Sequence, residues 1–322
     1  RRAVLTGLDA DMRYFVRVRA VGAGGATSDW TARLSARTIL ATDPLPLAVA
    51  TYNVKCHSCG GPSWKGRRSG VASTIASRGL DVVGLQEAQQ SGGPQFLTLV
   101  RALNTIQPGW RLTSSKVRGT LGVRIIYNSN TVKLLDGGGV RYRFQGNTSR
   151  YHQRYYTWGL FQQRSSGKRF YFFNTHIDPD SLTARVAQGR ELGEAVRRMR
   201  GPLPAVVVGD FNASQFKVYE VHEAMTDAGL IDPLGVREDS YRIGRGARAE
   251  RRIHTHFDSF NGFDDRPRKS TGKNKNGKYI DYIFVTPMRV VEFENVVNLD
   301  SAGRYRRAAS DHNMLRAIVG LP

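Results

Sequence analysis

Residues 205–212 of the chain read Ala-Val-Val-Val-Gly-Asp-Phe-Asn. The apolar run is typical of a central strand that is buried on both faces, and it ends where Asp210 and Asn212 begin. Side chains two residues apart in a strand face the same way, so a carboxylate and an amide are expected side by side at the edge of a core. Such a pair can hold a water molecule or an anionic oxygen by accepting and donating hydrogen bonds together.

Five further blocks place polar residues beside apolar runs. In chain order they are Thr51-Tyr52-Asn53-Val54, Leu85-Gln86-Glu87, Asn174-Thr175-His176, Ile280-Asp281-Tyr282-Ile283-Phe284 and Ser310-Asp311-His312. A carboxylate such as Glu87 is costly at the edge of a core unless it is paired or binds a metal ion. Carboxylates, amides and histidines held rigidly at strand ends suit a hard divalent cation and a phosphate ester.

The two histidines of these blocks are candidate proton carriers. A neutral imidazole needs a carboxylate to fix its tautomer and raise its basicity, and we expect Asp281 to be that partner for His312. His176 is expected to be a second proton carrier or a donor to phosphate. Taken singly, a residue such as Asn53 is more often a turn former, and a histidine at a strand end such as His176 is usually structural.

The ordered set of blocks resembles the endonuclease/exonuclease/phosphatase superfamily, which includes deoxyribonuclease I. The resemblance spans residues 47–322. It implies an α/β fold, a four-layer α/β sandwich with two packed mixed β-sheets flanked by helices, and metal-dependent cleavage of a phosphate ester. It also implies Mg²⁺ as cofactor, with Mn²⁺ or Ca²⁺ as alternatives.

The resemblance assigns roles to individual residues. Asn53, Glu87 and Asp311 match positions of the metal site. Asp210 and Asn212 match the pair that orients the attacking water and the scissile phosphate. His312, backed by Asp281, matches the general base or acid, and His176 matches the second histidine. Arg154 and Tyr127 match phosphate-contacting positions more loosely.

The sequence predicts helices and strands in the same region. The predicted helices cover 67–78, 96–103 and 182–199, and the predicted strands cover 47–52, 81–85, 122–127, 157–161, 169–174, 205–208, 279–285, 290–297 and 314–319. Strands mixed with helices indicate a sheet core that is flanked by helices. No apolar stretch approaches the ~18–20 residues of a membrane span.

The first residues form a different pattern. Tyr14, Val16, Val18 and Ala20 share one face of an alternating strand, and a glycine-rich turn leads to Ser28-Asp29-Trp30. This pattern resembles the last strands of a fibronectin type III sandwich. We therefore expect a small all-β N-terminal fragment over 1–39, a linker over 40–46 and a catalytic domain over 47–322. The chain starts at Arg1 without a methionine, so we expect its beginning to lie upstream.

Two cysteines, Cys56 and Cys59, stand in a Cys-His-Ser-Cys sequence. Even with His57 they offer fewer than the four ligands of a structural zinc site, and the following Gly60-Gly61-Pro62 does not open a helix as in a thioredoxin-like motif. The two remaining alternatives are a loop disulfide and a pair of free thiols. A disulfide and a fibronectin-like segment would both favour a secreted or cell-surface protein.

The composition favours a polyanionic substrate. The 322 residues carry a formal charge of +21, and a field of that sign attracts nucleic acid. Many of the basic residues fall in 237–278, a region read either as a functional loop or as solvated charge. The candidate nucleic-acid contacts there are Arg251, Arg252, Lys269, Lys273, Lys275 and Lys278.

These observations predict a monomeric, secreted, metal-dependent nuclease that hydrolyses DNA and/or RNA by in-line attack of water. The alternative on the same fold is a phospholipid or phosphoinositide hydrolase, of the sphingomyelinase or 5-phosphatase kind. Such an enzyme needs an apolar membrane-docking loop, which the sequence does not show convincingly. A non-catalytic binding protein is a third reading, and the intact set of blocks argues against it.

Overall fold

The computed structural model describes residues 5, 8, 12–37, 46–90, 94–113, 122–146, 153–214, 218–235, 248–269, 278–306 and 308–322. The chain divides into two compact units, Arg1–Pro44 and Leu45–Pro322. Most of the predicted linker, residues 40–45, lies outside the described residues.

The first unit contains a two-stranded antiparallel sheet. Its strands are β1 (Arg13–Val16) and β2 (Leu34–Arg37), and Tyr14 pairs with Ala36. Between the strands, the guanidinium groups of Arg17 and Arg19 lie 5.5 and 4.7 Å from the ring centroid of Trp30. A strand pair of this kind is common to many β folds, so the fibronectin resemblance stays a prediction.

The second unit is built on two sheets. The five-stranded sheet has the order β12-β10-β9-β8-β7, with bounds Asp281–Val285, Ala205–Asp210, Arg169–His176, Tyr155–Gln163 and Val132–Arg141. The seven-stranded sheet has the order β11-β13-β14-β3-β4-β6-β5, with bounds Arg251–Ile253, Arg289–Val296, Met314–Gly320, Pro46–Asn53, Val82–Gln86, Arg124–Asn128 and Trp110–Leu112. Both sheets contain parallel and antiparallel pairs.

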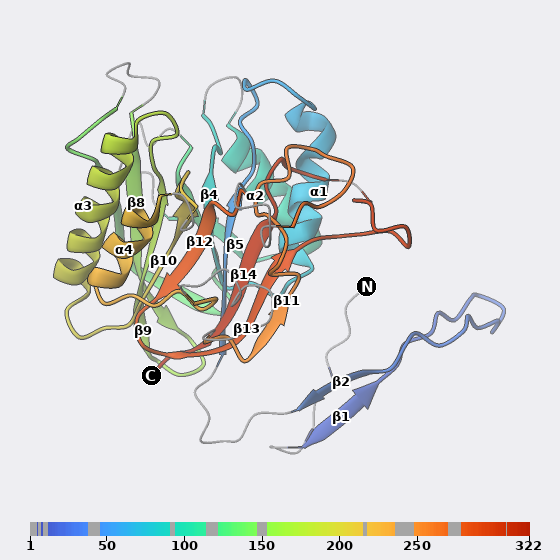
Figure 1. Ribbon diagram of the computed structural model, residues 1–322. Helices are drawn as coiled ribbons and strands as arrows, with labels where there is room; N and C mark the ends of the chain where they lie inside the picture. The colour runs from blue at the N-terminus through green and yellow to red at the C-terminus, as the bar shows by residue number, and fades with distance from the viewer. Residues whose placement is uncertain are drawn as a thin grey trace. The chain divides into compact units, whose positions relative to one another are not determined.

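Helices cover the outer faces of both sheets. Helices α1 (Trp64–Ala76) and α2 (Gln95–Ile106) pack on the seven-stranded sheet through one apolar cluster. Helices α3 (Leu182–Arg200) and α4 (Tyr219–Asp227) pack on the five-stranded sheet, on the opposite side of the unit (Figure 1). The predicted four-layer α/β sandwich is therefore confirmed. Among the described residues, no helix combines the length and apolar character that a membrane crossing requires.

The two sheets approach closely at Gly84 in β4. A Cβ atom at this position would lie 2.4 Å from Val208 Cγ2 and 2.7 Å from Asn174 Oδ1, on the facing strands β10 and β9. Asn174 is fully buried, and its Nδ2 donates to the carbonyl oxygens of Leu85 and Arg124 at 2.9 and 2.8 Å. This contact fixes the end of β4, in the seven-stranded sheet, against β9 in the five-stranded sheet.

Most predicted elements are present, with ends shifted by a few residues. The sequence missed β5, β7, α4 and β11. β7 was missed because it contains Gly137-Gly138-Gly139, which favours a turn in an isolated sequence. In the sheet, a Cβ at Gly138 would lie 3.1 Å from Trp158 Nε1 on the paired strand. The glycine thus makes room for the tryptophan ring.

Candidate active site

Three polar residues stand side by side on three neighbouring strands of the five-stranded sheet, β9, β10 and the edge strand β12. Asp210, the last residue of β10, pairs with His176 on the parallel strand β9 and with Asp281 on the antiparallel strand β12. The apolar residues Val206, Val207 and Val208 before Asp210 are fully buried, so the strand that carries the acid is fixed in the core. The residues of three separate sequence blocks are thereby brought into one row.

Asp210 is the centre of the site. Its Oδ2 accepts a hydrogen bond from Asn53 Nδ2 at 3.0 Å and lies 3.6 and 3.7 Å from Nε2 of His176 and His312. Asp210 is 2% exposed. Burial, reinforced by the nearby negative charge of Asp281, raises the pKa of Asp210 to about 7, although His312 and two hydrogen bonds oppose the rise. A carboxyl group with this pKa can exchange a proton near neutral pH.

His312 and Asp281 form a buried pair across the two sheets. His312 Nδ1 lies 2.8 Å from Asp281 Oδ2. Burial alone would lower the pKa of His312, but the charge and hydrogen bond of Asp281, together with the charges of Asp210 and Asp311, outweigh it and raise the pKa to about 10. His312 is therefore an imidazolium at neutral pH. The ring of Phe260 packs edge-on against it, with 5.0 Å between the centroids.

His176 has the opposite charge state. Burial lowers its pKa well below the usual value, and the positive charges of Arg154 and His312 lower it further. His176 is therefore neutral at neutral pH, although its ring lies as close to Asp210 as that of His312.

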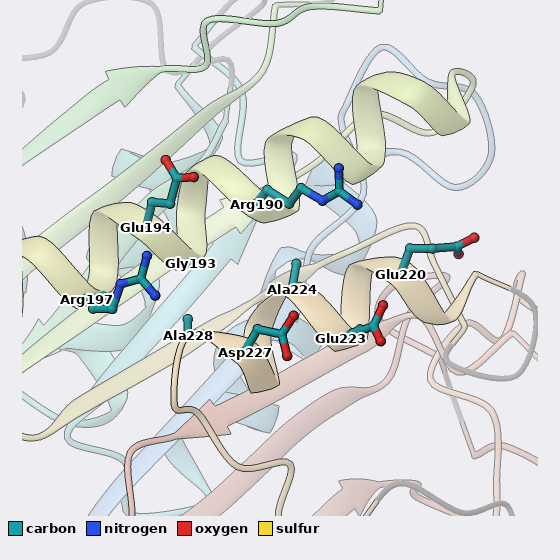
Figure 2. Close-up of a pocket in the computed structure, with 9 residues that line it drawn as sticks. All are labelled: Arg190, Gly193, Glu194, Arg197, Glu220, Glu223, Ala224, Asp227 and Ala228. Atoms are coloured by element: carbon teal, nitrogen blue, oxygen red, sulfur yellow. The ribbon is translucent and has the colours of Figure 1, made fainter.

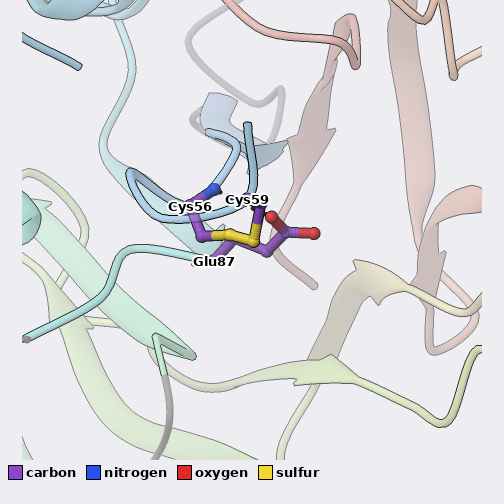
Figure 3. Close-up of side chains that lie close together, drawn as sticks. All are labelled: Cys56, Cys59 and Glu87. Atoms are coloured by element: carbon purple, nitrogen blue, oxygen red, sulfur yellow. Dashed lines mark hydrogen bonds between the residues drawn. A yellow bond between two sulfur atoms is a disulfide. The ribbon is translucent and has the colours of Figure 1, made fainter. Parts of the chain in front are cut away.

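Glu87 reaches the site from the end of β4. Its Oε1 accepts from Asn53 Nδ2 at 3.0 Å, and its Oε2 accepts from the backbone N–H of Cys56 at 2.8 Å. Cys56 and Cys59 form a disulfide, and Figure 3 shows it beside the Glu87 carboxylate. Of the two sequence alternatives, the structure therefore has the loop disulfide. The disulfide constrains the loop from Cys56 to Cys59, and the backbone N–H of Cys56 is the group that donates to Glu87.

Asn53 joins the two sheets. It is fully buried, and its single amide nitrogen donates both to Glu87 and to Asp210, while its oxygen accepts from the N–H of Lys55 at 3.0 Å. As the structure stands, Asn53 orients two carboxylates. Its predicted role as a metal ligand stays a prediction.

Asn212 lies just beyond β10 in a left-handed conformation, with φ at 45°. Its backbone N–H donates to Asp210 Oδ1 at 2.9 Å, and its Nδ2 donates to the carbonyl oxygen of Ile177 at 3.1 Å. Arg185 of α3 donates to the Asn212 carbonyl oxygen. These contacts place Asn212 beside Asp210 and fix the carboxylate.

Asp311 precedes His312 and carries an ion pair. Its Oδ2 lies 2.9 Å from Nζ of Lys55. The sequence blocks did not single out Lys55, although it stands only two residues after Asn53. Its proximity in the chain was the available signal.

Arg154 lies near the acids of the site. Burial lowers its pKa, and the charges of Asp178, Asp210 and Glu87 oppose that effect. Tyr127 is placed elsewhere, which corrects its expected contact with phosphate. It pairs with Val82 at the start of β4, whereas the site lies beyond the other end of that strand, and its ring packs against Phe161 in the core.

The candidate nucleic-acid contacts are dispersed. Lys278 Nζ lies 4.5 Å from the centroid of the Phe260 ring, which in turn contacts His312, so this lysine is next to the site. Arg251 is paired with Glu292 of β13 at 3.0 Å. Arg252 pairs with Phe293 of β13, and Lys269 forms an isolated bridge with Phe257. Lys273 and Lys275 lie outside the described residues.

The donor set fits a hard divalent cation. Glu87, Asp210, Asp281 and Asp311 offer carboxylate oxygens, which are the ligands that Mg²⁺ prefers. Two buried atoms, Asp281 Oδ1 and Arg154 Nε, have no hydrogen-bond partner within the described part of the chain. A buried polar atom without a partner in the protein is one that a water molecule or an ion can satisfy. Glu87, whose two oxygens accept from the neutral donors Asn53 and Cys56, is the acid best placed to hold an ion.

A hollow between α3 and α4 is separate from this site. It has a volume of about 200 Å³ and is lined by charged residues of both signs, which Figure 2 shows on the facing sides of the two helices. None of its lining residues belongs to the polar cluster around Asp210. Its opposing charges fit a helix–helix contact.

The comparisons with known proteins agree with this geometry. Residues 50–312 match the model of the Endonuclease/Exonuclease/phosphatase family. The chain belongs to the endonuclease/exonuclease/phosphatase family. This membership gives the chain a hydrolase fold whose members generally depend on divalent metal ions.

Several solved structures share the fold. An endonuclease/exonuclease/phosphatase family protein of Bacteroides thetaiotaomicron is 23% identical, with a TM-score of 0.67 over 87% of this chain and 99% of the other. The mannosyl-6-phosphatase Bt3783 of the same organism is also 23% identical, with a TM-score of 0.65 over 85% and 99% of the two chains. TDP2 of D. rerio, complexed with a single-strand DNA product, is 17% identical, with a TM-score of 0.61 over 85% and 98%. No curated protein matches the chain.

Proposed function

We propose that the protein is a metal-dependent phosphodiesterase that hydrolyses nucleic acid, DNA and/or RNA. The observation that carries the proposal is the buried row of Asp210, Asp281 and the two histidines, with Glu87 joined to Asp210 through Asn53. Two opposite histidine charge states beside one titratable carboxyl group suit acid–base chemistry. Mg²⁺ is the proposed cofactor, with Mn²⁺ or Ca²⁺ as alternatives.

In the proposed reaction, each residue has a distinct task. Asp210, with its pKa of about 7, accepts the proton of the attacking water. The imidazolium of His312 donates to an oxygen of the scissile phosphate, and Asp281 holds that ring through Nδ1. Neutral His176 and Arg154 contact the phosphate from the other side. A divalent ion, when bound, neutralises phosphate charge and stabilises the leaving oxyanion.

The charge of the chain supports nucleic acid as the substrate. The formal charge is +21, and Lys278 stands next to His312 through the Phe260 ring. Contacts from Lys and Arg to phosphates dominate non-specific affinity for nucleic acid. The complex of TDP2, a structure of the same fold, contains a single-strand DNA product.

The test is a substrate panel with wild type and His312→Ala. Plasmid DNA and an RNA transcript are incubated with Mg²⁺, Mn²⁺ or Ca²⁺, with and without a chelator. We expect metal-dependent degradation that the variant lacks and that falls steeply between about 50 and 200 mM salt. Intact DNA and RNA at low salt with all three metals would refute the nuclease proposal.

The same panel includes the alternatives. Sphingomyelin and phosphoinositide vesicles test the phospholipid-hydrolase reading, and a phosphorylated mannoside is added because a solved structure of this fold is a mannosyl-6-phosphatase. Release of phosphate or phosphocholine without cleavage of nucleic acid would select one of these substrates.

We also propose that the protein is a secreted monomer. The Cys56–Cys59 disulfide supports export, since such bonds persist in oxidising compartments. Mass spectrometry of the protein from its native source, alkylated without reduction, is expected to show no alkylated cysteine. Free thiols in that sample would contradict export.

A further inference from the structure

The ion pair between Lys55 and Asp311 lies inside the proposed metal site. Lys55 Nζ is 2.9 Å from Asp311 Oδ2, and the two side chains are 21% and 9% exposed. Because both groups are largely shielded from water, the ammonium compensates the carboxylate more strongly than a surface pair would. A second cation at Asp311 would have to displace this ammonium.

The backbone of Lys55 is held in a conformation that lysine rarely adopts. Its φ is 53°, in the left-handed region that costs a residue other than glycine energy. Its carbonyl oxygen accepts from Nη2 of the buried Arg67 at 2.6 Å and from Nε2 of the buried Gln95 at 3.0 Å. Its N–H donates to Asn53 Oδ1 at 3.0 Å. Lys55 is thus fixed from three sides.

Asp311 is fixed equally firmly. The hydroxyl of the preceding Ser310 donates to the carbonyl oxygen of Asn53 at 2.7 Å. The backbone N–H groups of Asn261 and Gly262 donate to the Asp311 carbonyl oxygen at 2.7 and 2.9 Å. Both partners of the ion pair are therefore anchored to Asn53 at the end of β3. The surrounding backbone thus holds the pair in a fixed position.

Glu87 differs from Asp311 in the hydrogen-bond donors around it. Its two oxygens accept from the amide of Asn53 and from the backbone of Cys56, which are neutral donors. These donors orient the carboxylate and leave its charge available to a cation. Among the described residues, Glu87 therefore has no cationic hydrogen-bond donor and is oriented to bind an ion, whereas Asp311 is already paired with the Lys55 ammonium.

We propose that the Lys55 ammonium takes the place of a second divalent cation at Asp311, so that the site binds a single divalent ion, at Glu87. The inference rests on the proposed metal-dependent function and sharpens it. Lys55 is then a positioning residue that sets the number of metal ions. Asp311 is the ion-pair partner of Lys55 and does not bind a metal ion.

The test counts bound Mn²⁺ per chain, by electron paramagnetic resonance and by calorimetric titration, in the absence of substrate. Wild type is expected to bind one ion, and Glu87→Gln is expected to lose it. Lys55→Asp, which removes the ammonium and adds a carboxylate beside Asp311, is expected to bind a second ion. Lys65→Asp is the matched control, because it makes the same change at an exposed lysine and should keep one ion.

A second variant guards against misfolding of the first. Lys55→Gln frees Asp311 without adding an acid, and we expect it to bind a second ion about tenfold more weakly than the first, since affinity follows the number of ligand charges. Two bound ions in wild type would overturn the inference. So would a single bound ion in folded samples of both Lys55 variants. Either result would leave the proposed function standing. No ion in wild type would overturn both.

Discussion

His176 and His312 lie at nearly equal distances from Asp210, yet their charge states are opposite. His312 is hydrogen-bonded through Nδ1 to Asp281, and that carboxylate stabilises the imidazolium. His176 faces Asp210 and the positive charge of Arg154. Both rings are buried, so burial alone cannot explain the difference.

The comparison shows that neighbouring carboxylates decide the protonation of a buried imidazole. Burial lowers the pKa of both rings, and for His312 the hydrogen-bonded Asp281, followed by Asp210 and Asp311, reverses this. The two histidines therefore have separate tasks in the proposed reaction. His312 supplies a permanent positive charge, whereas His176 supplies a neutral donor or acceptor.

The largest expected effect is that of His312→Ala. Because the imidazolium is removed and Asp281 is left buried without its partner, we expect kcat to fall about a thousandfold or more. Steady-state hydrolysis of the nucleic-acid substrate measures it. The matched control is His222→Ala, because His222 is also buried and paired with an acid, Asp232, at 3.0 Å. An equal loss in both variants would show that His312 matters for stability alone.

A smaller effect is expected from Asp281→Asn, seen in the pH profile. In wild type the His312 charge is present at low pH and is lost as pH rises through its pKa of about 10. Asp281 raises this pKa more than the other nearby acids, Asp210 and Asp311, so its removal lowers the pKa of His312. We therefore expect the alkaline limb of kcat to move to lower pH, with about a hundredfold loss at neutral pH.

The control for this profile is Asp232→Asn, which removes the acid of the other buried pair. It should lower the melting temperature without moving the alkaline limb. An unmoved limb in Asp281→Asn would mean that the charge of His312 does not depend on Asp281.

The fold could be predicted where burial dominates the sequence. Val206, Val207 and Val208 lie in a strand covered on both faces, so their apolar run indicated β10 directly. The short strand β5 and the short helix α4 were missed because few residues carry their pattern. The edge strand β11 has half-buried and exposed residues, and strands of that kind leave little hydrophobic signal.

The sequence predicted which residues form the site better than it predicted the contacts between them. Asp281 was expected beside His312 because a catalytic imidazole needs a carboxylate partner, and the structure brings the two together. The pair of Lys55 with Asp311 could not be predicted, because it depends on β14 lying next to β3 in the sheet. Tyr127 was misplaced for a similar reason, since the antiparallel register of β6 carries it away from the site.

The smallest expected effect is that of His176→Ala. A neutral ring contributes no net charge to the transition state, so we expect about a tenfold fall in kcat, which is below the ~10²–10⁴-fold range for a proton-transfer group. The alkaline limb should not move, since it belongs to His312. An NMR pH titration of the wild-type protein tests the neutrality of His176 directly. Its ring resonances should show no protonation until well below the ordinary histidine pKa. If the ring titrates above neutral pH, the two histidines share one charge state there, and the division of roles between them fails.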